Sequence, residues 1–180
     1  MRVFIAIDVP HEIRQRLAAM QDRLRQASNS ARWVATDSIH ITLKFVGEIP
    51  AKRREDIDNA MTGLSWKPLS ISVRRLGFFP GKRSPRVLWA GVECPTMERL
   101  ATEVESRLVL AGFDRENRAF RPHLTLARTK ESRLESTLVK TAEPFVETEF
   151  GTFQADRVHL YQSTLQPGGS LYTKLKEYPL

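Results

Sequence analysis

Hydrophobic and polar residues along the chain follow two periods, one typical of strands and one typical of helices. The opening run Arg2–Val9 is apolar and rich in β-branched residues, as in a mostly buried strand. In the next segment apolar side chains recur every three or four positions, which places them along one face of a helix. These side chains are Ile13, Leu17, Met20 and Leu24. The pattern therefore predicts a strand followed by a helix that packs on a sheet.

The same two periods continue toward the C-terminus, separated by clusters of Gly and Pro. Further strands are expected at 33–34, 39–46, 69–73, 86–92, 145–153 and 157–163, with a last short strand after a turn at 166–170. Helices are expected at 51–64, at 97–111 and through Leu134 and Leu138. Residues 77–85 contain two Gly and two Pro, and we expect them to form a loop.

The strand-and-helix pattern of the first half begins again near Val87. From Val3 to His40 is 37 residues, and from Val87 to His123 is 36 residues. The chain is therefore expected to be a single domain made of two internal repeats, approximately 1–85 and 86–180. The expected fold class is α+β and bilobal, with two pseudo-symmetric lobes, each an antiparallel sheet with outer helices, and an active-site cleft between them.

A short motif, His-x-Thr-Leu, occurs once in each repeat, at 40–43 and at 123–126. In an extended chain, residues two positions apart lie on the same side, roughly 6.5 to 7 Å from each other. His40 and Thr42 should therefore share one face of a strand, and His123 and Thr125 should share one face of another. Two such pairs among only four histidines indicate one site built from both repeats.

Two histidines can act together at neutral pH, because an unperturbed imidazole has a pKa of about 6.5. One neutral imidazole takes a proton from an attacking hydroxyl, and one protonated imidazole gives a proton to the leaving oxygen. Each threonine hydroxyl can donate a hydrogen bond to a phosphoryl oxygen. This combination suits displacement at phosphorus, and a strained cyclic phosphate would require neither ATP nor a metal ion.

Other interpretations of these residues remain open. Zinc could use two histidines, but neither motif has a cysteine pair or a carboxylate at ligand spacing, so we expect no metal and no cofactor. Threonines are also common in strands for packing reasons. His11 and His159 have no counterpart in the other repeat and are expected to be structural or surface residues. Cys94 lacks an activating motif and is expected to be a small apolar filler.

Composition narrows the class of protein and of partner. With 180 residues, of which 41% are hydrophobic, the chain can form a sizeable core. Its net charge of +7 favours anionic partners such as nucleic acid or nucleotides. Its apolar runs are too short to span a bilayer, its N-terminus lacks a signal-peptide pattern, and its one cysteine fits a reducing compartment. We expect a cytoplasmic monomer with no membrane association.

The two motifs also resemble those of a known family. The chain resembles the 2H phosphoesterases in both motifs, in Lys44–Glu48 after the first motif and in Phe120–Pro122 before the second. Among these enzymes it is most similar to the RNA 2′,3′-cyclic phosphodiesterases, also called 2′-5′ RNA ligases. The resemblance extends from the first strand to the tail at 165–172. It implies hydrolysis of terminal 2′,3′-cyclic phosphates on RNA or nucleotides to 2′-phosphates, with a related 2′-5′ ligation. It further implies that His40 is the general acid and His123 the general base.

The resemblance implies two substrate-binding residues in addition, Phe45 to stack on a base and Arg128 to contact phosphate. Each lies five positions after its histidine, and an odd offset places a side chain on the opposite face of a regular strand. Only an early strand end, a sharp twist or a bulge would bring them to the site. Without one, Phe45 would be a core residue and Arg128 a solvated surface charge. Phe78 and Phe79 could stack on bases or anchor their loop in the core.

Two further functions stay open at this point. Another 2H activity would act on 2′-5′ linked oligonucleotides or on small cyclic nucleotides. A non-catalytic RNA-binding module would use the same basic cleft without turnover. Matched histidines in both repeats favour an enzyme, because binding alone does not require an acid and a base.

Overall fold

The strands form two antiparallel sheets in the computed structural model, which describes residues 1–167 and 169–180 and so leaves out Gly168 of the expected turn. The four-stranded sheet has the order β3-β1-β8-β9, with bounds His40–Glu48, Arg2–Asp8, Arg157–Gln166 and Gly169–Pro179. The five-stranded sheet has the order β2-β6-β5-β4-β7, with bounds Ala31–Trp33, His123–Thr129, Val87–Glu93, Leu69–Phe79 and Glu149–Ala155. The expected α+β, two-lobed architecture is confirmed.

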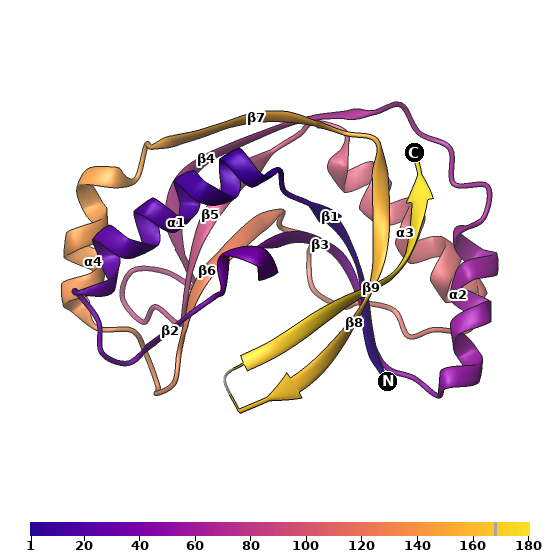
Figure 1. Cartoon of the computed structure of the whole chain (residues 1–180), viewed down its shortest axis with the longest axis horizontal. Helices are drawn as coiled ribbons and strands as arrows, with labels where there is room; N and C mark the ends of the chain where they lie inside the picture. Colours follow the sequence, from indigo (N-terminus) through magenta and orange to yellow (C-terminus); the bar gives the residue numbers. More distant parts are fainter. Residues whose placement is uncertain (168) are drawn as a thin grey trace.

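The helices cover the outer sides of the two sheets (Figure 1). They are α1 (His11–Arg25), α2 (Arg54–Met61), α3 (Met97–Leu110) and α4 (Ser136–Ala142), with short 3-10 segments at Thr36–Ser38, Ala51–Arg53 and Glu143–Phe145. Helices α1 and α4 lie with the five-stranded sheet, and α2 and α3 lie with the four-stranded sheet. No helix in the described part of the chain is long and apolar enough to cross a bilayer.

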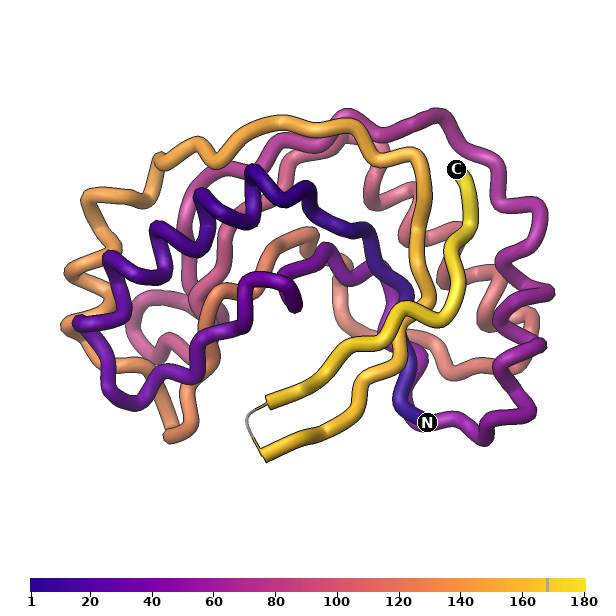
Figure 2. Tube along the Cα trace, in the orientation of Figure 1, coloured from indigo at the N-terminus to yellow at the C-terminus, as the bar shows by residue number. Residues whose placement is uncertain are grey.

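The lobes do not coincide with the two halves of the sequence. Strands β1 and β3 pair with the C-terminal strands β8 and β9, and β2 and β4 join strands of the second half. Helix α1 follows β1 but packs against β2 and β7, while α3 follows β5 but packs against β3. Figure 2 traces these crossings, and both chain ends lie in the lobe of the four-stranded sheet. Each motif strand is therefore supported by a helix from the other half of the chain.

Three expected boundaries are wrong, and one of them is the strand expected at 145–153, which begins only at Glu149 because Glu143–Phe145 form a 3-10 segment. Residues 77–79 were expected in a loop, but β4 continues through Phe79, because these residues pair with Trp89, Leu88 and Val87 of β5. Gly77 fits there because the Trp89 ring occupies the space of a side chain, with ring carbon Cζ2 only 2.1 Å from an added Cβ. The last strand, expected to be short, runs for 11 residues, and the β8–β9 hairpin projects toward the other lobe (Figure 1).

The core lies between each sheet and its helices. The predicted stripe of α1 is buried throughout, and so are the apolar residues of β1 and of the two motifs. Ile41 and Leu43 of β3 and Leu124 and Leu126 of β6 point into the core. Because neighbouring residues of a strand point to opposite faces, this burial turns the motif histidines and threonines away from the core.

Candidate active site

His40 and His123 are the first residues of β3 and β6, and each ring is held in the same way. The Nδ1 of His40 donates to the carbonyl oxygen of Ser38 at 2.8 Å, and the Nδ1 of His123 donates to that of Arg121 at 2.7 Å. A carbonyl oxygen can only accept, so the proton of each neutral ring resides on Nδ1. Nε2 of both rings is then the basic atom.

Burial lowers the pKa of both motif histidines. The pKa of His40 falls to about 4, chiefly because the buried ring loses solvation, while the Ser38 carbonyl and Asp8 act in the opposite direction. Strands β3 and β6 contact each other, and the positive charges of Arg128 and of His123 also lower the pKa of His40. The pKa of His123 is lowered by burial and by Arg128. At neutral pH both imidazoles are neutral in the free protein.

A β-bulge follows each threonine of the motifs. In β3, Thr42 pairs with Ala6 and Lys44 with Ile5, so Leu43 has no partner across the strands. In β6, Thr125 pairs with Trp89 and Ala127 with Leu88, so Leu126 has none. The bulged residue lies at the same place in both motifs, and one extra residue reverses the alternation of all side chains after it.

The bulges place Phe45 and Arg128 on the same faces as the histidines. Phe45 pairs with Phe4, and the two rings lie 5.9 Å apart between centroids. The guanidinium of Arg128 donates to the hydroxyl oxygen of Thr125 at 3.3 Å. Both side chains are exposed, so the core interpretation of Phe45 is wrong, and Arg128 is an exposed charge that lies against Thr125.

The bulge in β6 is held by Gln21 of α1, which is 1% exposed. Its side-chain amide donates to the carbonyl oxygens of Leu126 and Val34, at 2.9 and 2.8 Å. The backbone amide of Val34 also donates to the Leu126 carbonyl. These bonds satisfy the carbonyl of the bulged residue, and a buried carbonyl without partners would be costly.

The bulge in β3 is supported from the other half of the chain by α3. Lys44 directly follows the bulge, is 3% exposed and forms an ion pair with Glu105 at 2.8 Å. Its ammonium also donates to the carbonyl oxygen of Asp114 at 2.6 Å. Glu105 accepts in addition from the backbone amide of Glu116, at the start of the segment that leads to His123.

Aromatic rings pack against both histidines. The ring of His40 stacks on Phe4 at 4.7 Å and meets the edge of Tyr172 at 5.1 Å. The ring of His123 lies 5.0 Å from Phe79, almost perpendicular to it. Phe79 thus contacts a motif histidine from β4, and its neighbour Phe78 is the core anchor. These contacts fix ring orientation and contribute to the desolvation that lowers the pKa values.

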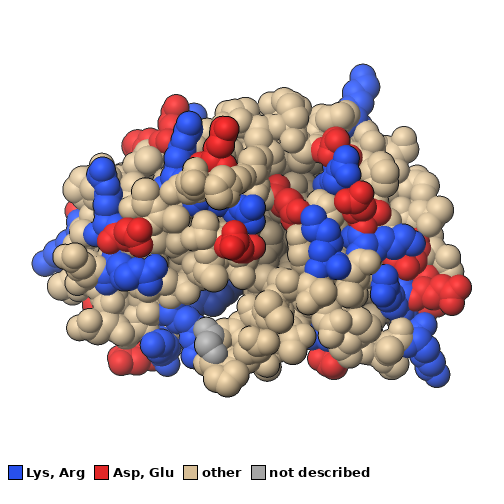
Figure 3. Space-filling model, in the orientation of Figure 1, with Lys and Arg blue, Asp and Glu red and all other residues tan. Residues whose placement is uncertain are grey.

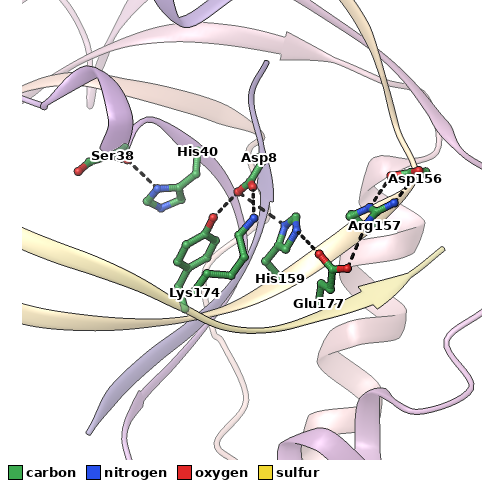
Figure 4. Close-up of polar contacts among 9 residues, drawn as sticks. Asp8, Ser38, His40, Asp156, Arg157, His159, Lys174 and Glu177 are labelled. Atoms are coloured by element: carbon green, nitrogen blue, oxygen red, sulfur yellow. Dashed lines mark hydrogen bonds and ion pairs between the residues drawn. The ribbon is translucent and has the colours of Figure 1, made fainter. Parts of the chain in front are cut away.

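A polar network begins at Asp8, the residue opposite His40, and extends along the four-stranded sheet (Figure 4). Asp8 pairs across the strands with His40 and accepts from the hydroxyl of Tyr161 and, at 2.7 Å, from Lys174. His159 is 3% exposed, with Nδ1 3.6 Å from Asp8 and Nε2 3.7 Å from Glu177. Burial nevertheless lowers the pKa of His159. His159 is therefore a packed residue of this network, in keeping with its expected structural role.

A pocket of about 160 Å³ opens beside His40. Its wall includes Ser38, Asp8, Tyr161 and Tyr172, with Arg14 and Asp37 on the side of α1. Figure 3 shows the hollow between the two lobes with Lys and Arg side chains near it. Among the described residues, no three of His, Cys, Asp and Glu come together as metal ligands would.

Several of these positions carry no signal in the sequence. Gln21 lies in a helix stripe where an apolar residue would serve equally well, and Lys44 follows a strand motif like many solvent-exposed lysines. Neither period nor composition shows that the two leucines of the motifs are bulged. The sequence indicates the bulges only through the odd offset of Phe45 and Arg128 from the motif histidines, because two expected site residues at such an offset require a bulge.

The sequence is similar to those of one family of known proteins. The profile of the family described as LigT like Phosphoesterase matches residues 7–89 and again 92–172. The RNA 2′,3′-cyclic phosphodiesterases of Methanocaldococcus jannaschii and Methanothermobacter thermautotrophicus are each 33% identical, over 99% and 100% of this chain and 100% and 99% of theirs.

Solved structures give the same picture. TT0787 of Thermus thermophilus superimposes with a TM-score of 0.83 at 28% identity, covering 100% of this chain and 98% of that one. The E. coli LigT complexed with 3′-AMP superimposes with a TM-score of 0.81 at 28% identity, covering 99% and 97%. Likeness in sequence and likeness in structure thus both span the entire chain.

Proposed function

The chain belongs to the LigT-like phosphoesterase family, and from this premise we propose that it hydrolyses the terminal 2′,3′-cyclic phosphate of RNA to a 2′-phosphate. The observation that carries the proposal is the matched pair of imidazoles, His40 and His123, each tied through Nδ1 to a carbonyl two residues earlier. Two imidazoles with basic Nε2 atoms, on strands that contact each other, are the groups that an acid–base displacement at phosphorus requires.

The roles follow the family analogy. His123 Nε2 takes a proton from water as the water oxygen bonds to phosphorus, and protonated His40 gives its proton to the departing 3′-oxygen. Thr42 and Thr125 donate hydrogen bonds to the phosphoryl oxygens, where negative charge develops. Arg128 lies against Thr125 and neutralises the phosphate, and Phe45 stacks on the terminal base.

Substrate binding must favour the protonated form of His40, which is the acid that the free site lacks. With the pKa of His40 at about 4, the acid form is scarce at neutral pH before binding. A bound phosphodiester brings negative charge into the site and raises the pKa of the nearby imidazole. Asp8, which already raises the pKa of His40, acts in the same direction. The acid is therefore generated when the anionic substrate binds.

The test is hydrolysis of a 2′,3′-cyclic mononucleotide by the wild-type protein and by His40→Ala and His123→Ala, each with and without a chelator. Each substitution should lower kcat by roughly 10² to 10⁴, the range for loss of a general acid or base. His11→Ala, at the exposed start of α1, is the matched control and should keep full activity. Full activity in either site variant would exclude the mechanism, and inactivation by chelator would restore the metal interpretation.

The same histidines and threonines would also serve ligation, in which the phosphate is transferred to an RNA hydroxyl and not to water. If an RNA 5′-hydroxyl replaced water at His123, the cyclic phosphate would open into a 2′-5′ linkage. Incubating a cyclic-phosphate RNA with a 5′-hydroxyl RNA tests this second reaction. A ligated product that depends on both histidines would support it, and hydrolysis without any ligated product would limit the protein to the first reaction.

A further inference from the structure

Arg32 lies beside the site without a role in the chemistry above. It is the central residue of β2, the edge strand of the five-stranded sheet, and it pairs directly with Arg128 of β6. Opposite residues of an antiparallel pair share a face, with Cα atoms about 4.5 to 5.5 Å apart. Because Arg128 contacts Thr125 on the histidine side, Arg32 also lies on that side. Its neighbours Ala31 and Trp33 turn toward the core.

This pairing is unfavourable for the protein alone. Like charges directly opposite each other across two strands destabilise a sheet. Within residues 1–167 and 169–180, neither Arg32 nor Arg128 forms an ion pair with a carboxylate, and both are exposed. Lys130, two residues beyond Arg128, is also exposed and also lacks an acidic partner among the described residues. Such an arrangement is stabilised when an anion lies between the charges.

The platform that carries Arg32 is rigid. The carboxylate of Glu135 accepts from the backbone amides of Asn29 and Ser30 and from the hydroxyls of Ser28 and Ser30, and so fixes the entry to β2. These bonds lower the pKa of Glu135 to about 2. After β2, Gln21 and Leu126 hold Val34. Both ends of a three-residue strand are anchored, which fixes the backbone of Arg32 opposite Arg128.

We propose that Arg32 binds the phosphodiester on the 5′ side of the terminal nucleotide, next to the cyclic phosphate held at Arg128. The inference rests on the proposed function and makes it more specific: the preferred substrate is an RNA strand of at least two nucleotides. Arginine suits this position because its planar guanidinium can donate two hydrogen bonds to one phosphate. Figure 3 shows Lys and Arg side chains gathered where Figure 1 places the ends of β2 and β6.

The experiment compares two substrates that end in the same 2′,3′-cyclic nucleotide, a mononucleotide without a 5′-phosphate and a dinucleotide with one phosphodiester. Arg32→Gln should lower kcat/KM for the dinucleotide about tenfold, equivalent to about 1.4 kcal/mol, and change the mononucleotide by less than about twofold. For the dinucleotide, the slope of log kcat/KM against log salt concentration should be smaller in magnitude by about one in Arg32→Gln than in the wild type. Arg32→Lys, which keeps the charge, should recover part of the loss. Arg99→Gln, an exposed arginine on α3, is the control of equal charge change.

Other outcomes would overturn the inference. An equal loss for both substrates would place Arg32 on the cyclic phosphate itself, and no loss for the dinucleotide would leave it without a substrate contact. If the wild-type protein hydrolysed neither substrate, the proposed function would fail instead. Binding of a dinucleotide 2′-phosphate to the wild type and to Arg32→Gln would then decide the role of Arg32, since the same tenfold difference in Kd is expected.

Discussion

Gln21 and Glu105 stand 84 residues apart, at matching positions of α1 and α3, and each supports the motif strand of the lobe on which its helix packs. Gln21 binds the bulged Leu126 of β6, and Glu105 binds Lys44, the residue after the bulge of β3. The two halves of the chain thus brace each other's histidine strands. We infer that the halves are an internal repeat, which the two matches to one family profile support.

The amide of Gln21 should matter for stability and for activity. Gln21→Met keeps the shape of the side chain but leaves the Leu126 and Val34 carbonyls with fewer partners, so we expect a loss of about 1 to 3 kcal/mol in the free energy of unfolding, measured in urea. Arg128 loses its fixed position, and kcat/KM should fall as well. Arg16→Met removes a bond from α1 to the Phe150 carbonyl, away from the site, and should leave kcat/KM unchanged. Equal kinetic effects from both variants would contradict a specific role of the bulge.

Removing one partner of the buried ion pair between Lys44 and Glu105 should cost more stability than removing both. Glu105→Gln leaves a buried ammonium without its counter-ion, and we expect a loss of about 3 kcal/mol in the free energy of unfolding. Replacing both residues, as Lys44→Met with Glu105→Leu, should recover much of that loss, because the uncompensated charge is gone. Glu147→Gln breaks an exposed pair with Arg75 and should change stability by less than about 0.5 kcal/mol. A double variant no more stable than Glu105→Gln would refute this explanation.

The pKa values of the histidines predict where the pH optimum lies. Both are lowered from 6.5, so the singly protonated pair in the free protein exists mainly below that pH. The logarithm of kcat/KM should therefore peak below about pH 6.5 and fall by about one per pH unit above it. A profile that is flat between pH 5 and 9 would be inconsistent with two titrating imidazoles.

The charge of Asp8 should shift this pH profile, because it raises the pKa of His40. Asp8→Asn removes the negative charge that raises the pKa of His40, so the alkaline fall of kcat/KM should move to lower pH. Glu177→Gln provides a matched control, because Glu177 contacts His159 and Arg157 at the far end of the same network. A profile that shifts equally in both variants would show that the charge of the whole network, and not Asp8, is responsible.

Much of the site follows from the sequence because it depends on local periodicity. Repetition of His-x-Thr-Leu indicates His40 and His123 as candidates, and the period of two places each threonine on the face of its histidine, as the alternating burial of β3 and β6 shows. The bulges at Leu43 and Leu126 could not be predicted, because they are held by Gln21 and Glu105, residues distant in sequence and brought near by the exchange of helices between lobes. The extension of β4 was hidden for a similar reason: Gly77 is in a strand because the Trp89 ring on the neighbouring strand requires its space.

Phe45 offers the most direct test of what the bulge in β3 achieves. Phe45 is 44% exposed on the histidine side, and its ring lies 5.9 Å from the ring of Phe4. Stacking of one base on such a ring contributes about 1 to 3 kcal/mol, so Phe45→Ala should raise KM roughly tenfold with little change in kcat. Phe45→Tyr preserves the ring and should behave like the wild type. Leu110→Ala, which removes another exposed apolar side chain, from α3, controls for general surface effects. A fall in kcat without a rise in KM would assign Phe45 to the support of His40 rather than to the substrate.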